Sequence, residues 1–488
     1  MTDPHVAAHV VWRGLAALAV ASALGAASHA GAQAPAAPRP TALADDPVLA
    51  RLIDESLAAR PERAAAGAQA RAEHERVPQA GALPDPVLTL GIQNDGFGSI
   101  QIGKMDTSFW QVLITQPFPW PGKLGLRTDV AALGAKAADA STARARLTTE
   151  ADVRRAYLAL LLARDRLALL GRLEAIWQKS AGIARTRYES GEAAQSDVLR
   201  AQLELNRLRQ RRWNLEAEER ARIQALNRLR ARPLDETIVT TTSIRDLPVP
   251  ALPPLEAAVS DAESRSPELA AARLGAEQAS KAAALARRER FPDFTVSAGI
   301  MPRGAIEPMW TASVGVTLPI WTGRKQNRAV AEMEARADSG TQNAEAIEQV
   351  LKLRVKDRRT ALAALLDSLK LYREGLLVQS RATADSTLAQ YQVGRVTFAS
   401  VLEANVGYIN DEDGYLESAV DAQRIAIASA EVSLEPVGSA SAGAMSASAV
   451  PGAGGMSSGR PGAAASAAAG GAPASETPPS SSPSSSGM

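Results

Sequence analysis

The chain has 488 residues, with 54 Lys and Arg against 53 Asp and Glu and a formal net charge of +1. This length is enough for two or three ordinary domains. Near-neutral charge, without a zinc-finger or RNA-binding motif, argues against a nucleic-acid partner, and the lack of cysteine excludes disulfides, thiolate metal sites and cysteine nucleophiles.

The first 32 residues have the features of a secretory signal peptide. Arg13 precedes an apolar stretch at 15–27, and small residues follow at positions 28, 30 and 32. A membrane anchor is the alternative, but a spanning helix needs roughly 20 apolar residues and this stretch is shorter. We therefore expect cleavage. Because no later stretch reaches the length of a spanning helix, any membrane part of the mature protein is expected to be a β-barrel.

Apolar and polar residues alternate in four short segments, which are grouped in two pairs. The predicted strands are residues 87–94, 108–116, 294–300 and 311–318. They predict two β-hairpins with polar loops at 95–106 and 301–308. Segments of this length that are apolar on one face are typical of transmembrane β-strands. A small soluble sheet packed on helices is the alternative.

A long helical segment follows each hairpin, and the two halves of the chain repeat each other. Residues 117–123 resemble 318–325, and a Tyr-x-x-Gly turn ending at Gly191 resembles one ending at Gly394. Apolar residues three or four apart on both sides of these turns predict pairs of antiparallel helices. An arm of about 65 residues would be roughly 100 Å long, so its narrow apolar stripe needs lateral partners, as in a coiled coil.

Four strands are too few to close a barrel. An open sheet edge in lipid leaves unpaired backbone groups, each of which costs several kcal/mol. The sequence therefore predicts a symmetric oligomer whose protomers contribute strands to one shared barrel.

Several motifs resemble those of the TolC-type outer-membrane efflux proteins. They are Leu83-Pro84-Asp85-Pro86, residues 116–124, and the two glycine turns followed by Asp197-Val198-Leu199 and Val401-Leu402-Glu403-Ala404. The resemblance covers residues 46–435, and its strand-to-helix turns are most similar to heavy-metal efflux members. It implies a mainly α protein with long helical hairpins forming a tunnel, in which each of three protomers adds four strands to a twelve-stranded barrel.

The resemblance also implies a location and partners. The protein is expected in the outer membrane of a Gram-negative bacterium, in contact with its lipid, as a homotrimer that extends into the periplasm. A periplasmic adaptor would link it to an inner-membrane transporter of the resistance-nodulation-division type. No nucleic acid, cofactor or bound metal is expected.

The resemblance implies three sets of functional residues. Tyr391 would hydrogen-bond Asp197 to hold the tunnel closed, and Glu403 would form a ring of negative charge around the constriction. The adaptor-facing turns would contain Tyr188, Gly191 and Gly394. The turns from barrel to tunnel would contain Pro119, Trp120, Gly122, Trp321 and Gly323. Packing inside the tunnel is the alternative for the two tryptophans, and a plain surface charge is the alternative for Glu403.

We divide the chain into eight parts. They are a signal peptide (1–32), an N-terminal periplasmic segment and helix (33–86), the first β-hairpin (87–116), the first helical hairpin (117–246), a linker with the helix that opens the second repeat (247–293), the second β-hairpin (294–318), the second helical hairpin (319–435) and a disordered Gly/Ala/Ser/Pro tail (436–488).

The predicted function is passive conduction of substrates from an inner-membrane pump to the exterior, with heavy-metal cations as candidate cargo. A drug-efflux or type I secretion channel of the same fold is the first alternative, and a periplasmic coiled-coil adaptor is the second. An enzyme is not expected, because a mature chain with one histidine, His74, and no cysteine offers few acid–base sets.

Overall fold

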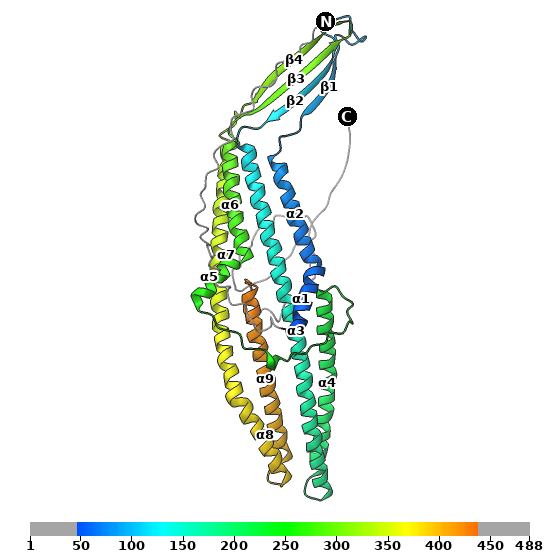
Figure 1. Cartoon of the computed structure of the whole chain (residues 1–488), viewed down its shortest axis with the longest axis vertical. Coiled ribbons are helices and arrows are strands. Elements are labelled where there is room, and N and C mark those ends of the chain that lie inside the picture. Colours follow the sequence, from blue (N-terminus) through cyan, green and yellow to red (C-terminus); the bar gives the residue numbers. More distant parts are fainter. Residues whose placement is uncertain (1–45, 438–488) are drawn as a thin grey trace, which may run out of the picture. The chain divides into compact units, whose positions relative to one another are not determined.

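The computed structural model describes residues 46–437 of the chain, so the predicted signal peptide and the predicted tail beyond residue 437 lie outside the described residues. Most of this part is helical, with four strands (Figure 1). In chain order the elements are α1 (Pro47–Ala59), α2 (Pro61–Gly81), β1 (Val87–Gln93), β2 (Phe109–Phe118), α3 (Lys123–Glu189), α4 (Gln195–Leu229), η1 (Ile244–Asp246), α5 (Leu255–Arg265), α6 (Pro267–Arg288), β3 (Asp293–Arg303), β4 (Ile306–Thr317), α7 (Gln326–Leu371), η2 (Tyr372–Leu376), α8 (Leu377–Gln392) and α9 (Phe398–Ala430).

The order of elements repeats once along the chain. Each half has two helices, two strands and a long helical hairpin. In both halves a proline begins the second helix, Pro61 in α2 and Pro267 in α6, where a missing N–H is harmless because that group has no acceptor within the helix. The predicted duplication and the mainly α fold with four strands are thus confirmed.

The strands form one antiparallel sheet in the order β1-β2-β3-β4. Its register aligns the apolar positions, with Leu90 opposite Val112 and Val112 opposite Ile300. Residues paired in this way lie on the same face of a sheet. We call the resulting set the apolar face: Leu88, Leu90, Ile92, Trp110, Val112, Ile114, Phe118, Phe294, Val296, Ala298, Ile300, Trp310, Ala312, Val314 and Val316.

Three strand boundaries differ from the prediction by two or more residues. The prediction of a loop at 301–308 is wrong. β3 extends to Arg303, β4 begins at Ile306, and a two-residue turn joins them. Gly304 has a φ of +69° there, a conformation that tight hairpin turns require and that glycine adopts without a steric penalty. β2 also runs through Pro117 to Phe118, two residues beyond its predicted end.

The long helices begin and end where the backbone changes conformation. α3 has 67 residues and is therefore about 100 Å long; Gly122 precedes it in the left-handed region, with a φ of +90°. α7 begins only at Gln326, and a π-helical turn, η2, joins it to α8. α4 ends at Leu229, so the helical part of the first hairpin is shorter than the predicted segment to residue 246. None of the helices within 46–437 has the combination of length and hydropathy that crossing a membrane requires.

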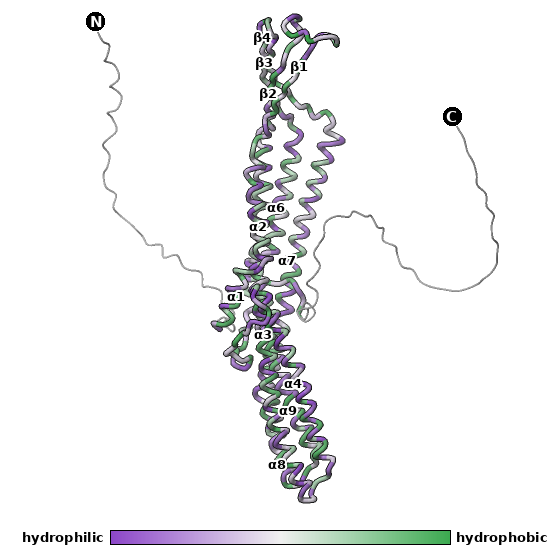
Figure 2. The backbone as a smooth tube through the Cα atoms, turned by 90° about the vertical axis from the view of Figure 1, so that its right-hand side faces the viewer, coloured by the Kyte–Doolittle hydropathy of each residue, from purple (hydrophilic) through white to green (hydrophobic). Residues whose placement is uncertain are grey.

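Helices from both halves of the chain pack together. Near the sheet, α3 contacts α2 and α6, and α6 contacts α7; further along, α3 contacts α4 and α9 (Figure 1). Hydrophilic and hydrophobic residues alternate along these helices (Figure 2). One buried cluster includes Tyr157, Leu160 and Leu416, and a second includes Trp177 and Tyr391 nearer the hairpin turns.

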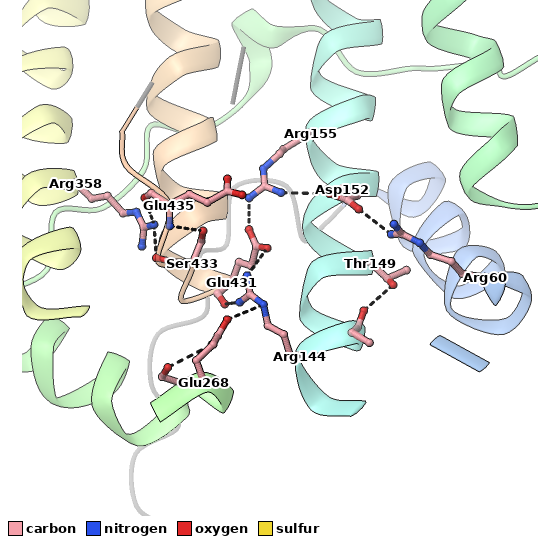
Figure 3. A network of polar contacts seen from close by, with 12 residues as sticks. Arg60, Arg144, Thr149, Asp152, Arg155, Glu268, Arg358, Glu431, Ser433 and Glu435 are labelled. Carbon is pink, nitrogen blue, oxygen red and sulfur yellow. Dashed lines mark hydrogen bonds and ion pairs between the residues drawn. The ribbon is translucent and has the colours of Figure 1, made fainter. Parts of the chain in front are cut away.

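An ion-pair cluster fastens the end of α9 to three other helices. The buried Glu431 accepts hydrogen bonds from Arg144 (3.1 Å) and Arg155 of α3 (Figure 3). Arg144 also pairs with Glu268 of α6, with 2.9 Å between Nε and Oε1, and Arg358 of α7 donates to backbone oxygens just after α9. Burial raises the pKa of Glu431, although the two α3 arginines favour its charged form.

We expect Gly299→Ala to weaken the sheet. A Cβ at this position would lie 2.5 Å from the backbone oxygen of Val112 and 3.1 Å from the Cα of Leu113 on the neighbouring strand. Strands β2 and β3 must therefore move apart, at a cost of about 1–3 kcal/mol. Thermal unfolding followed by circular dichroism should show a lower midpoint than for Gly98→Ala, where a Cβ has open space. Equal midpoints would contradict this packing.

Candidate functional site

Two glycine turns close the helical hairpins, and we call residues 190–194 and 393–397 together the tip. Gly191 and Gly394 have φ values of +80° and +77°. Each donates its N–H to the carbonyl of the tyrosine three residues earlier, Tyr188 or Tyr391, at 3.0 and 3.1 Å. The two Tyr-x-x-Gly motifs therefore fold into the same turn.

The two tyrosines nevertheless have different surroundings. The side chain of Tyr188 is exposed (45%), whereas Tyr391 is buried (1%). Tyr391 packs on Phe398, with 5.4 Å between ring centroids, and its Oη donates to Asp197 Oδ2 at 3.5 Å. The structure thus brings together Tyr391 of α8 and Asp197 of α4, the pair that the resemblance implies.

The phenol of Tyr391 is held in its protonated form. Burial raises its pKa, and the negative charge of Asp197 raises it further, while Arg187 acts in the opposite direction. A protonated phenol is a hydrogen-bond donor, which suits a bond to the Asp197 carboxylate.

Arg187, in the last turn of α3 beside the tip, is a residue that the sequence reasoning missed. Its guanidinium lies over the Tyr391 ring, 4.9 Å from the centroid, and donates to the Tyr391 carbonyl at 2.7 Å. It also pairs with Glu192 of its own turn at 3.7 Å. Arg187 therefore links the two turns. The sequence contained one signal for this role. Arg187 is charged, whereas the corresponding residue of the second repeat, Gln390, is neutral.

Glu403 lies on α9, nine residues after Gly394, and its side chain is exposed. Within the described part of the chain no hydrogen bond or ion pair involves its carboxylate. It is therefore free to act on ions in the surrounding water, whereas Glu412 further along α9 is buried and paired with Arg245.

The strand-to-helix turn of the first repeat is built around Trp120 and Asp293. The Trp120 ring stacks on Phe291 and Phe294, each 5.4 Å away between centroids, and the backbone N–H of Trp120 donates to Asp293 Oδ1 at 2.7 Å. The buried Lys123 donates to the same oxygen at 2.7 Å. Pro119 and Gly122 thus lie in a turn that is fixed to β3 by contacts the sequence did not reveal.

The corresponding turn of the second repeat is open. Trp321 is exposed, and a Cβ at Gly323 would have no neighbour within 4 Å. The turn is closed by backbone bonds, with Lys325 N donating to Trp321 O at 3.0 Å. The stacking of Trp120 on two rings favours the alternative that this residue has a packing role. The side chain of Trp321, in contrast, is exposed.

No group of three or more His, Asp or Glu residues within 46–437 has the geometry to hold a metal ion. His74 instead pairs with Asp139, with 3.0 Å between Nε2 and Oδ2.

The sequence matches a family model described as outer membrane efflux protein over residues 52–232 and 258–431. The comparison with curated proteins gives no match.

Solved structures of outer-membrane channels are similar to this chain. OprN is 20% identical, with a TM-score of 0.68 and coverage of 82% of this chain and 93% of that chain. CusC is 18% identical, with a TM-score of 0.68 and coverage of 79% and 92%. The open state of MtrE from Neisseria gonorrhoeae is 17% identical, with a TM-score of 0.68 and coverage of 80% and 89%. At these identities the likeness concerns the fold.

The raised pKa of Tyr391 predicts a pH dependence. Because the folded-state pKa lies above that of the unfolded chain, this group stabilises the fold below about pH 10, and the contribution is lost as the pH rises through the folded-state pKa. The free energy of unfolding should therefore fall more steeply at alkaline pH for the wild type than for Tyr391→Phe. Denaturant titrations at several pH values measure this, and parallel curves would contradict it.

Proposed function

Since this chain belongs to the outer membrane efflux protein family, we propose that it is the exit channel of a tripartite efflux system. Three copies would form a continuous conduit, made of a shared twelve-stranded barrel and a helical tunnel in the periplasm.

The exposed apolar face of the sheet is the observation that carries this proposal. Val314 and Leu90 are each 70% exposed, and Trp310 is 80% exposed. A soluble protein rarely exposes so large a continuous apolar surface, whereas lipid would cover it favourably. The opposite face, mainly Thr, Ser, Gln and Gly, suits a water-filled interior.

The ends of the sheet support assembly. β1 and β4 each have one partner strand in the described structure, so each has an unpaired edge. In lipid these edges must be paired. Since neighbouring strands alternate in direction, β4 of one copy can pair antiparallel with β1 of the next. A ring of three copies then removes every edge.

The tip supports a gate. The bond from Tyr391 to Asp197 and the contacts of Arg187 hold the α8–α9 turn against the α3–α4 turn. At 3.5 Å the bond from Tyr391 to Asp197 is longer than an ordinary O–H···O hydrogen bond, so we assign it about 1.4 kcal/mol, just under the range for charged acceptors. This amount is enough to favour a closed tip, and a docked partner can supply enough binding energy to open it.

The expected partners are a periplasmic adaptor at the tip and an inner-membrane transporter of the resistance-nodulation-division type. A passive conduit need not bind its cargo, so metal cations and organic compounds both stay candidates, as does a secretion role. An adaptor function is disfavoured, because an adaptor would have a single helical hairpin flanked by a compact β-domain, whereas this chain has two hairpins and one shared sheet.

We expect the wild-type protein to form channels in planar lipid bilayers and Tyr391→Phe to raise their open fraction. Loss of one bond worth about 1.4 kcal/mol changes the closed-to-open ratio roughly tenfold. Asp197→Ala should act in the same direction. Tyr408→Phe is the matched control, because its hydroxyl donates to Glu412 on the same helix at 2.9 Å and does not join the two hairpins.

Single-channel recording gives the readout. Unchanged open fractions in both Tyr391→Phe and Asp197→Ala would show that these two residues do not form the gate. A wild-type protein that forms no channels would contradict the proposed function itself.

Glu403→Gln should reduce the preference for cations. Three symmetry copies of a free carboxylate would attract cations to the constriction, so neutralising them should shift the reversal potential in a salt gradient toward zero. Glu374→Gln is the control, since Glu374 is also exposed and has no ion pair in the described residues but lies in η2, away from the tip. Equal shifts of the reversal potential in the two variants would show that Glu403 does not line the constriction.

A further inference from the structure

The apolar face of the sheet continues past the end of β4. Leu318, Ile320 and Trp321 follow Thr317 and are 68%, 73% and 68% exposed. Three large exposed apolar side chains so close together in the sequence are unusual on a surface that faces only water. They lie where the strands end and the helices begin.

Exposed cations follow immediately. Arg324, Lys325 and Arg328 are all exposed, and none of their side chains makes a hydrogen bond or ion pair with another described residue. The turn that contains them is nearly helical, since Arg324 N and Lys325 N both donate to Trp321 O, at 3.2 and 3.0 Å. Spacings of three, four and seven residues from Trp321 place the three cations on its side of the turn.

A fourth cation comes from the neighbouring strand. Asp293 at the start of β3 pairs with Thr317 at the end of β4, so Arg290, three residues earlier, is brought to the same end of the sheet. Arg290 is also exposed and has no partner among residues 46–437. We call Arg290, Trp321, Arg324, Lys325 and Arg328 the basic–aromatic patch.

The same position in the first repeat is different. Lys123 is buried and satisfied by Asp293 and by the carbonyl of Phe291 at 2.8 Å. At the opposite end of the sheet, Arg303 pairs with Asp106 at 3.7 Å; the acidic Asp95 lies in the loop after β1, and Glu307 lies at the start of β4. Four unpaired cations therefore lie at the helical end of the sheet, where β3 begins and β4 ends, whereas Lys104 is an exposed cation of the opposite end without a side-chain partner among residues 46–437.

We propose that the basic–aromatic patch binds the phosphate group of an anionic phospholipid in the inner leaflet of the outer membrane. This inference rests on the proposed function, because it needs the apolar face to lie in lipid. Trp321 then lies at the depth of the headgroups, where an indole ring is favoured. Arg324, Lys325 and Arg328 reach the phosphate with charge-assisted hydrogen bonds, and acyl chains cover Leu318 and Ile320.

A neighbouring copy is the competing occupant. Pairing of β4 with the next copy's β1 would bring Asp85, which precedes β1 and is exposed, near the same end of the sheet. One carboxylate cannot neutralise three or four cations. The apolar residues beside Asp85, such as Leu83, offer Trp321 a contact but no negative charge, so the charge balance favours lipid.

The experiment uses the full mature protein in nanodiscs that contain phosphatidylglycerol and phosphatidylethanolamine. The protein is extracted in mild detergent, and the lipid that remains bound is quantified by mass spectrometry. The variant is Arg324→Gln with Lys325→Gln and Arg328→Gln. The control removes three exposed, unpaired charges from the helices away from the sheet, Lys179→Gln, Arg220→Gln and Lys370→Gln.

We expect the wild type and the control to retain phosphatidylglycerol in preference to phosphatidylethanolamine. In the patch variant this preference should fall at least about fivefold, since the variant removes three of the four cations that attract an anionic headgroup. A second variant, Trp321→Ala, should lower the total lipid retained with less effect on headgroup preference.

Three results would overturn the proposal. The first is a patch variant that retains as much phosphatidylglycerol as the wild type. The second is displacement of the lipid by excess inorganic phosphate, which would identify a site for phosphate alone. The third is dissociation of the patch variant into monomers, which would assign the cations to a neighbouring copy. Channel recordings on the same samples separate these results from failure of the proposed function, because a patch variant that still conducts leaves that function intact.

Discussion

The structure is governed by the cost of leaving backbone groups unpaired beside an apolar surface. The sheet has unpaired edges at β1 and β4, and its apolar face is exposed. In lipid, each unsatisfied N–H or C=O costs several kcal/mol, so one copy of this sheet is not a stable end state. In the proposed assembly, further copies remove the edges, and only the apolar face is left for lipid. The helices of that assembly would surround a common axis, because each strand pair leads directly into a helical hairpin.

Duplication supplies the elements twice, and the differences between the copies are where function is expected. Tyr188 and Tyr391 lie at the same position of two equivalent turns, but only Tyr391 is buried and bonded to Asp197. Lys123 and Lys325 lie in corresponding strand-to-helix turns, but only Lys123 has a carboxylate partner. The first difference joins the two hairpins by a hydrogen bond between Tyr391 and Asp197. The second leaves the charge of Lys325 without a partner among the described residues.

Much of this architecture could be predicted from the sequence, because its signals are local. Period-two alternation identified all four strands, although Phe118 and Trp310 of the apolar face lie beyond the predicted strand ends. The Tyr-x-x-Gly motifs identified both tip turns. The short turn at Gly304 was missed, because only the backbone conformation of that glycine shows that the strands continue. The contacts of Arg187 with Tyr391 and of Lys123 with Asp293 join residues 204 and 170 positions apart, and no local pattern reports contacts of that kind.

Cross-linking between β1 and β4 of different copies tests the central claim most directly, and a chain without native cysteine suits it. Val87→Cys would be combined in turn with Ser313→Cys, Gly315→Cys or Thr317→Cys, all on the same face of the sheet as Val87. After oxidation in membranes, at least one combination should give a covalent trimer on a denaturing gel, while each single variant should not. Monomers from every combination would show that the edges of the sheet are not closed by neighbouring copies.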